Sequence, residues 1–175
     1  MAARRRSFAR DARGVVAVEF AIIAPMMIVI LAGIYEIGHA FQAMTAANAL
    51  ASQYAISWAD CQDNPTGTCL TEMGLYTPTD SIANLEPQLT ASSVNVEMFQ
   101  VSMTGTTPVV TYAYPLATPL TASQITAAQT SLQNGQTGVI VTVNYTYTVS
   151  IFPSAIGNLI PTSIPMSYTV VQLKD

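Results

Sequence analysis

Charged side chains are scarce in this 175-residue sequence: 9% of its residues are Asp, Glu, Lys or Arg, against roughly a quarter in an average soluble protein. Hydrophobic residues make up 50% of the chain. Disordered chains combine low hydrophobicity with high net charge, so this composition excludes a disordered protein. The length suits one modest domain, and the chain must bury its apolar surface in a core or in a membrane.

Basic residues are nearly absent after the first thirteen positions. All five arginines lie at positions 4–13, and the one later basic residue is Lys174. Between Glu97 and Lys174 no residue carries a formal charge. A nucleic-acid-binding surface needs clustered Lys or Arg to displace counterions, and the body of this chain lacks them. The sequence therefore excludes nucleic acid as a partner.

Side chains that serve as general acids or bases are equally few. At positions 98–173 tyrosine is the only such residue, and the single histidine, His39, lies far upstream in a helical segment. Two cysteines and one histidine make a poor zinc site. We therefore expect a structural or interaction protein with no catalytic residue, metal or cofactor. An anchored periplasmic enzyme or binding domain is the alternative, which a deep pocket with convergent polar groups would favour.

One long apolar run is present, at residues 15–35, and Glu19 is its only charge. A helix of this length spans about 30 Å, the thickness of a bilayer core. Pro25 lies inside the run, and transmembrane helices tolerate a proline kink. Because the arginines precede the run, the positive-inside rule predicts a single-pass protein in membrane lipid, with a cytoplasmic N-terminus and a periplasmic C-terminal domain.

Two other export signals fit this start less well. A secretory signal peptide has a shorter apolar region followed closely by an A-x-A site, whereas A-x-A tripeptides here, such as that at 49–51, lie well past the end of the run. Residues 5–8, Arg-Arg-Ser-Phe, are similar to a twin-arginine motif, but no cofactor-binding pattern follows them. A simple membrane anchor does not account for Glu19, because an anchor needs no charged residue inside its apolar run.

A family resemblance is carried by the residues around the start of the run. Gly14, four apolar residues, Glu19 and Phe20 follow a basic leader, as at a prepilin-type processing site. The sequence RGVVAVEFAIIAP, continued by IYEIGHAFQAMTAANALASQYA, resembles the TadE-like family of tight-adherence (Flp) pilus proteins over about the first 55 residues. This resemblance implies cleavage after Gly14, which leaves Val15 as the N-terminus.

The resemblance also implies a role and a set of partners. The chain would be a minor pilin-like (pseudopilin) subunit in a bacterial inner membrane, or in the pilus itself, that acts in pilus assembly or initiation. Its implied partners are a prepilin-type peptidase, other pilin and pseudopilin subunits, and the inner-membrane assembly platform. Glu19 would pair with the N-terminal amine of a neighbouring subunit. Two alternatives stay open: Glu19 snorkels to the headgroups, or the chain is a TadG-like assembly factor that is never cleaved.

Past the apolar run the helical period continues to Trp58, which predicts one rod over residues 15–58. Ala43, Ala47 and Ala51 repeat at the small-xxx-small spacing that lets another helix approach. Together with Glu19 and Pro25 they are the candidates for subunit packing. The alternative is that this stripe packs under the chain's own sheet. Glu36 and His39 lie three positions apart on the rod, and we interpret them as an interfacial pair rather than as metal ligands.

Cys61 and Cys69 flank a turn-rich segment after the rod. In an exported chain two such cysteines predict a local disulfide, which by the chain-entropy model would contribute about 2 to 3 kcal/mol. Their spacing differs from Cys-x-x-Cys, which argues against a redox function.

Beyond residue 89 the hydrophobic period changes to alternation, which predicts antiparallel strands with one buried face. The predicted strands lie at 94–98, 107–114, 139–151 and 164–170, and a helix capped by Thr121 is predicted at 122–133. The expected fold class is α+β: a long N-terminal transmembrane helix followed by a small antiparallel sheet with one short helix. The expected divisions are a leader at 1–14, the helix at 15–58, and the outer domain at 59–175.

Overall fold

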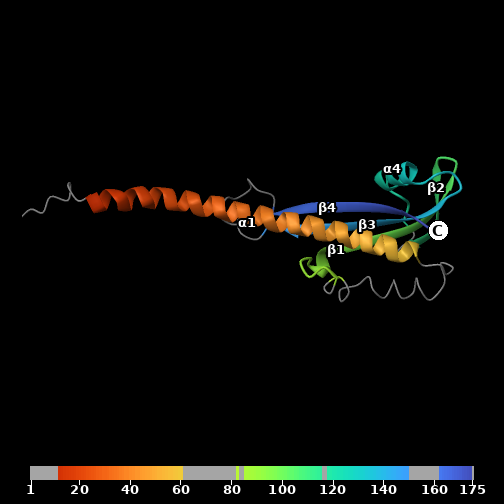
Figure 1. Cartoon of the computed structure of the whole chain (residues 1–175), viewed down its shortest axis with the longest axis horizontal. Helices are drawn as coiled ribbons and strands as arrows, with labels where there is room; N and C mark the ends of the chain where they lie inside the picture. Colours follow the sequence, from red (N-terminus) through yellow and green to blue (C-terminus); the bar gives the residue numbers. More distant parts are fainter. Residues whose placement is uncertain (1–11, 61–81, 83–84, 116–117, 150–161, 175) are drawn as a thin grey trace, which may run out of the picture. The chain divides into compact units, whose positions relative to one another are not determined.

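The computed structural model describes residues 12–60, 82, 85–115, 118–149 and 162–174. These residues form a long helix, a four-stranded antiparallel sheet and a second short helix, which confirms the predicted α+β class (Figure 1). The elements in chain order are α1 (Ala12–Ala59), the 3-10 helix η2 (Ala91–Ser93), β1 (Val94–Thr104), β2 (Thr107–Tyr114), α4 (Ala122–Ser131), β3 (Thr137–Thr148) and β4 (Ser163–Leu173).

Helix α1 is continuous through Pro25, the only proline that it contains. At the C-terminal end of the helix, the Asp60 amide donates to the Ile56 carbonyl at 3.0 Å. The chain divides into two compact units, Met1–His39 and Ala40–Asp175. The second unit therefore holds the last five turns or so of α1 together with the sheet, since a turn takes 3.6 residues.

The strand order in the sheet is β2-β1-β3-β4, and each neighbouring pair is antiparallel. All four predicted strands are present, but β1 is longer than its predicted 94–98 and runs on to Thr104. The alternation pattern did not predict the second half of β1, because buried residues there lie on both faces of the sheet. Val96 and Met98 belong to one hydrophobic cluster, and Phe99 and Val101 belong to the other.

The sheet is covered on its two faces by different helices. The larger cluster joins the C-terminal turns of α1 to the sheet through Leu50, Tyr54 and Trp58, which pack with residues such as Val141. The smaller cluster lies under α4 and is built from Phe99, Val101, Met103, Ala128, Leu132 and Ile140. Strands buried on both faces need apolar residues at successive positions, as in the central part of β3.

Helix α4 begins as the sequence predicts and ends two residues earlier. Thr121 caps it through a capping box: its hydroxyl accepts from the Gln124 amide, and the Gln124 side chain accepts from the Thr121 amide at 2.8 Å. Leu132 is already extended, with φ −115° and ψ 142°, so the helix stops at Ser131. The following turn uses Gly135 at φ +83°, a conformation that favours glycine.

Candidate functional site

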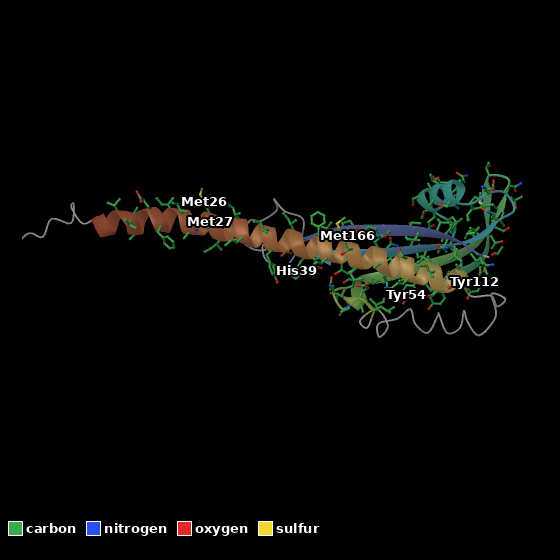
Figure 2. All side chains as sticks on the ribbon, in the orientation of Figure 1. Met26, Met27, His39, Tyr54, Tyr112 and Met166 are labelled. Carbon is green, nitrogen blue, oxygen red and sulfur yellow. The ribbon has the colours of Figure 1, made fainter. Side chains whose placement is uncertain are left out.

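Residues 14–35 of α1 form an almost wholly apolar surface. None of them is buried, and large side chains such as Phe20 (71% exposed) point away from the helix axis. Met26 and Met27 stand out from the ribbon in the same way (Figure 2). Among the described residues, α1 is the one helix long and apolar enough to cross a membrane. These features are consistent with single-pass membrane anchoring, as the hydrophobic run predicted.

The residues of the predicted processing site lie in the first turns of this helix. Gly14 is the third residue of α1, and a Cβ added to it would meet no atom within 4 Å. The next residue is Val15, where the implied cut would create an amine. Glu19 lies four residues further on, and so on the same helix face as Val15. Phe20 follows it, and both side chains are exposed.

The carboxylate of Glu19 is the one charge in this apolar surface. No hydrogen bond or ion pair joins it to another residue in the described part of the chain. A carboxylate inside a spanning helix usually has a partner, because its insertion costs roughly 2.5 to 3.5 kcal/mol. None of the described residues supplies that partner.

Polar and aromatic residues mark the end of the apolar surface. The rings of Tyr35 and His39 contact each other with centroids 4.4 Å apart and a tilt of 54°. Aromatic residues are common where a helix leaves the hydrocarbon core. Glu36 is 8% exposed. Within the described residues no group of three or more His, Cys, Asp and Glu is placed to hold a metal ion.

The alanine stripe lies in the core of the second compact unit, Ala40–Asp175. Ala43, Ala47 and Ala51 are 3%, 0% and 0% exposed, and they pack in the larger hydrophobic cluster with the sheet. This burial supports the alternative in which the stripe lies under the sheet, and packing of these alanines against another subunit stays a prediction.

The outward face of the same helical turns was missed by the sequence analysis. Phe41 is 62% exposed and Ile56 is 54% exposed. Between them, Thr45 and Ser52 turn their hydroxyls back to carbonyls of their own helix, at 2.9 Å from Gln42 O and 3.0 Å from Asn48 O. The face therefore combines two bulky apolar ends with small, internally satisfied polar residues, and it carries no charge.

A second site missed by the sequence analysis is a buried polar network between α4 and the sheet. Gln124 is 1% exposed, and its Nε2 donates to Thr142 Oγ1 at 3.0 Å and to Glu97 Oε2 at 3.4 Å. The Thr142 hydroxyl also contacts Thr169 Oγ1 at 3.0 Å. Because the same Gln124 caps its own helix, one side chain fixes both the start of α4 and its position on the sheet.

One open depression of about 510 Å³ lies where β1, β3 and β4 approach each other at one end of the sheet. It is lined by Gln100, Gly135, Gln136, Thr137, Leu173 and Lys174. Lys174 Nζ donates to Gln100 Oε1 at 3.3 Å within it. This lining offers a single cation and amide groups, which are not the convergent acid, base and nucleophile that would favour an enzyme.

Cys61 and Cys69, the cysteines of the predicted disulfide, lie outside the described residues.

Comparison with known proteins gives one match. Residues 14–55 match the model of the family described as TadE-like protein. No curated protein matches the chain, and no solved structure matches it. The matched segment begins at Gly14 and covers the exposed apolar surface and most of the part of α1 that packs on the sheet. Residues 14–55 therefore form a TadE-like segment, as the motif predicted, and this family implies involvement in the assembly of tight-adherence (Tad) pili.

Proposed function

We propose that this chain is a minor pilin-like subunit of a tight-adherence pilus, which is inserted in the bacterial inner membrane with its N-terminus in the cytoplasm. The observation that carries the proposal is the coincidence of the family match at 14–55 with a helix whose residues 14–35 are nowhere buried by the chain itself. Such a surface needs lipid or other helices around it. A pilus subunit would contact lipid while it is in the membrane and other helices once it is in the filament. The subunit would catalyse no reaction.

We further propose that a prepilin-type peptidase removes residues 1–14. The cut would lie in the first turn of α1, where the helix lacks its full set of hydrogen bonds and opens easily. The new amine at Val15 would then be free to pair with Glu19 of a neighbouring subunit. Packing against other pilin and pseudopilin subunits would use the exposed part of α1, including Phe41 and Ile56, and the outer domain would be displayed around it.

The uncleaved assembly factor is the competing function within the same system, and one experiment separates the two. The full chain is expressed in cells with an active prepilin-type peptidase, and its intact mass is measured in the membrane fraction and in sheared pili. A trimmed protein that begins at Val15 and is found in pili supports the minor pilin. A full-length protein confined to the membrane, with its assembly platform, contradicts it.

The disulfide between Cys61 and Cys69 belongs to the same proposal, because it requires an oxidising compartment for the outer domain. Peptide mapping of the membrane protein without reductant should show the two cysteines linked. Free thiols at both positions would contradict the disulfide and also the periplasmic location.

A further inference from the structure

Strand β2 forms one edge of the sheet, and its outer side is blocked by a proline. Pro108 lies opposite Met103 of β1. The Met103 amide donates to Gln136 O and its carbonyl accepts from Gly135 N, both at 2.9 Å, so the backbone of Met103 faces away from β2. In an antiparallel pair the residue opposite such a position also turns its backbone outward. Pro108 therefore faces the open side of β2, where it offers no N–H.

A β-bulge disrupts the same edge. The register moves from the pair Val101–Val110 to the pair Gln100–Tyr112, so Thr111 has no partner residue on β1. The Thr111 hydroxyl donates to the Gln100 carbonyl at 3.1 Å and holds the bulge in place. Outward backbone groups on β2 are thus irregularly spaced, and a regular incoming strand cannot match them. Prolines and bulges are two devices by which proteins protect exposed sheet edges.

Strand β4 forms the other edge of the sheet in the described part of the chain. Lys174 N donates to Thr137 O and Val149 N donates to Thr162 O, each at 3.0 Å. These two bonds show that even-numbered residues of β4 face β3, so its odd-numbered residues face outward. Pro165 is an outward residue and blocks the first part of the edge. After it, the backbone groups that point away from β3 belong to Ser167, Thr169, Val171 and Leu173.

Residues 167–173 lack every device that protects β2. Their outward groups follow one another at the regular spacing of two, and the pairing with β3 shows no register shift. Strand β4 also contains no charged side chain, which is the other common protection of an edge. The outward residues Ser167 and Thr169 carry hydroxyls. An incoming strand with uncharged hydroxyl or β-branched side chains fits this edge, whereas a charged one would find no counter-charge on β4.

We propose that residues 167–173 of β4 are a strand-addition site for an extended, uncharged segment of another pilus subunit, and that the β2 edge is closed to such addition. Main-chain hydrogen bonds would supply most of the affinity, as in other cases of strand addition. This inference rests on the proposed function, since it takes the partner from the same pilus.

The first test is residue-resolved amide hydrogen exchange on the full chain, in detergent as an isolated protein and in sheared pili. In the isolated protein the outward amides of residues 167, 169, 171 and 173 should exchange fast and the even-numbered ones slowly. In pili the outward amides should slow by about tenfold or more, while the even-numbered amides change little. This period-two pattern identifies strand pairing, which general burial of the domain does not produce.

The second test compares the same chemical change on the two edges. Ser167→Pro removes one outward N–H from β4 at an exposed position. Val110→Pro removes one outward N–H from β2, since Val110 pairs with Val101 and its backbone groups also point away from β1. Both variants should insert, be trimmed and keep the circular dichroism of the wild type. Ser167→Pro should reduce the amount of subunit in pili by about fivefold or more, whereas Val110→Pro should leave it unchanged.

Three results would overturn the proposal: fast outward amides in pili, slow outward amides in the isolated chain, or equal incorporation of the two proline variants. The wild-type protein separates this failure from a failure of the proposed function. If wild-type subunit is trimmed and present in pili but its outward amides stay fast, only the strand-addition site is wrong. If wild-type subunit never enters pili, the proposed function itself is wrong.

Discussion

The rings of Trp58 in α1 and Tyr112 in β2 meet nearly at right angles, with an interplanar angle of 86° and centroids 5.8 Å apart. Trp58 is 0% exposed. In the described part of the structure its Nε1 is the one buried side-chain nitrogen or oxygen without a hydrogen-bond partner. The contact therefore joins the C-terminal end of the long helix to an edge strand by aromatic packing alone, and it leaves a polar N–H in the core.

Replacing Trp58 tests this arrangement. Trp58→Ala should lower the free energy of unfolding by about 3 to 5 kcal/mol, because it opens a large cavity. Trp58→Phe should cost about 1 kcal/mol or less, since it also removes an N–H whose burial without a partner costs about 1 to 3 kcal/mol. Chemical denaturation of the full chain in detergent measures both variants. Equal losses for the two variants would mean that the indole N–H is satisfied.

The network around Gln124 predicts a large effect from a residue in a short helix. Gln124→Ala removes the capping box and the buried hydrogen bond to Thr142, so it should destabilise the outer domain by about 2 to 3 kcal/mol. Thr130→Ala is the matched control on the same helix, because the exposed Thr130 hydroxyl bonds only to Thr126 O of its own helix. The control should lie within about 0.5 kcal/mol of wild type in the same denaturation experiment.

Gly138 is required because Leu132 and β4 approach it closely. A Cβ at this position would lie 2.7 Å from both Cδ atoms of Leu132 and 3.0 Å from the Gln172 carbonyl. Gly138→Ala should therefore cost about 1 to 3 kcal/mol through overpacking. Leu132→Ala should relieve part of that clash, so the double variant should lose less stability than the sum of the two single variants. Strict additivity would show that the backbone contact alone sets the cost.

The two faces of α1 within the unit Ala40–Asp175 should respond differently to substitution. Ala47→Leu places a large side chain in a fully buried position and should destabilise the domain by about 1 to 3 kcal/mol. Phe41→Ala changes an exposed side chain, so the free energy of unfolding should stay within about 0.5 kcal/mol of wild type while the amount of subunit in pili falls. Normal incorporation of Phe41→Ala would remove this face from the packing surface.

Glu19 should matter to assembly and not to insertion. Glu19→Ala removes an unfavourable charge from the bilayer, so the chain should insert and be trimmed as well as wild type or better. In a filament it would leave the amine of the neighbouring subunit unpaired, which by analogy with broken buried ion pairs costs about 3 to 5 kcal/mol and would exclude the subunit.

The measurement for Glu19 compares the trimmed protein in the membrane with the protein recovered in pili. Glu19→Gln is the matched control, because it keeps the shape of the side chain and removes only its charge. Loss of incorporation in both variants with normal trimming supports the pairing. Normal incorporation of both variants would mean that Glu19 only snorkels to the headgroups.

Several features of this protein were determined by short-range sequence signals. The apolar run at 15–35, the spacing from Gly14 to Glu19 and the helical period beyond them are local, so they predicted the membrane-capable helix and the TadE-like segment. Thr121 likewise predicted the start of α4, because a capping box involves residues only three apart.

Other features were decided only when the strands paired. Alanines at small-xxx-small spacing admit any close neighbour, and only the presence of β1 and β3 beneath α1 decided that Ala47 belongs to the core and Phe41 to the surface. The bond from Gln124 to Thr142 joins residues on different elements, so no local pattern contains it. The direction of each edge backbone group depends on register, and register is a property of the assembled sheet rather than of any one strand.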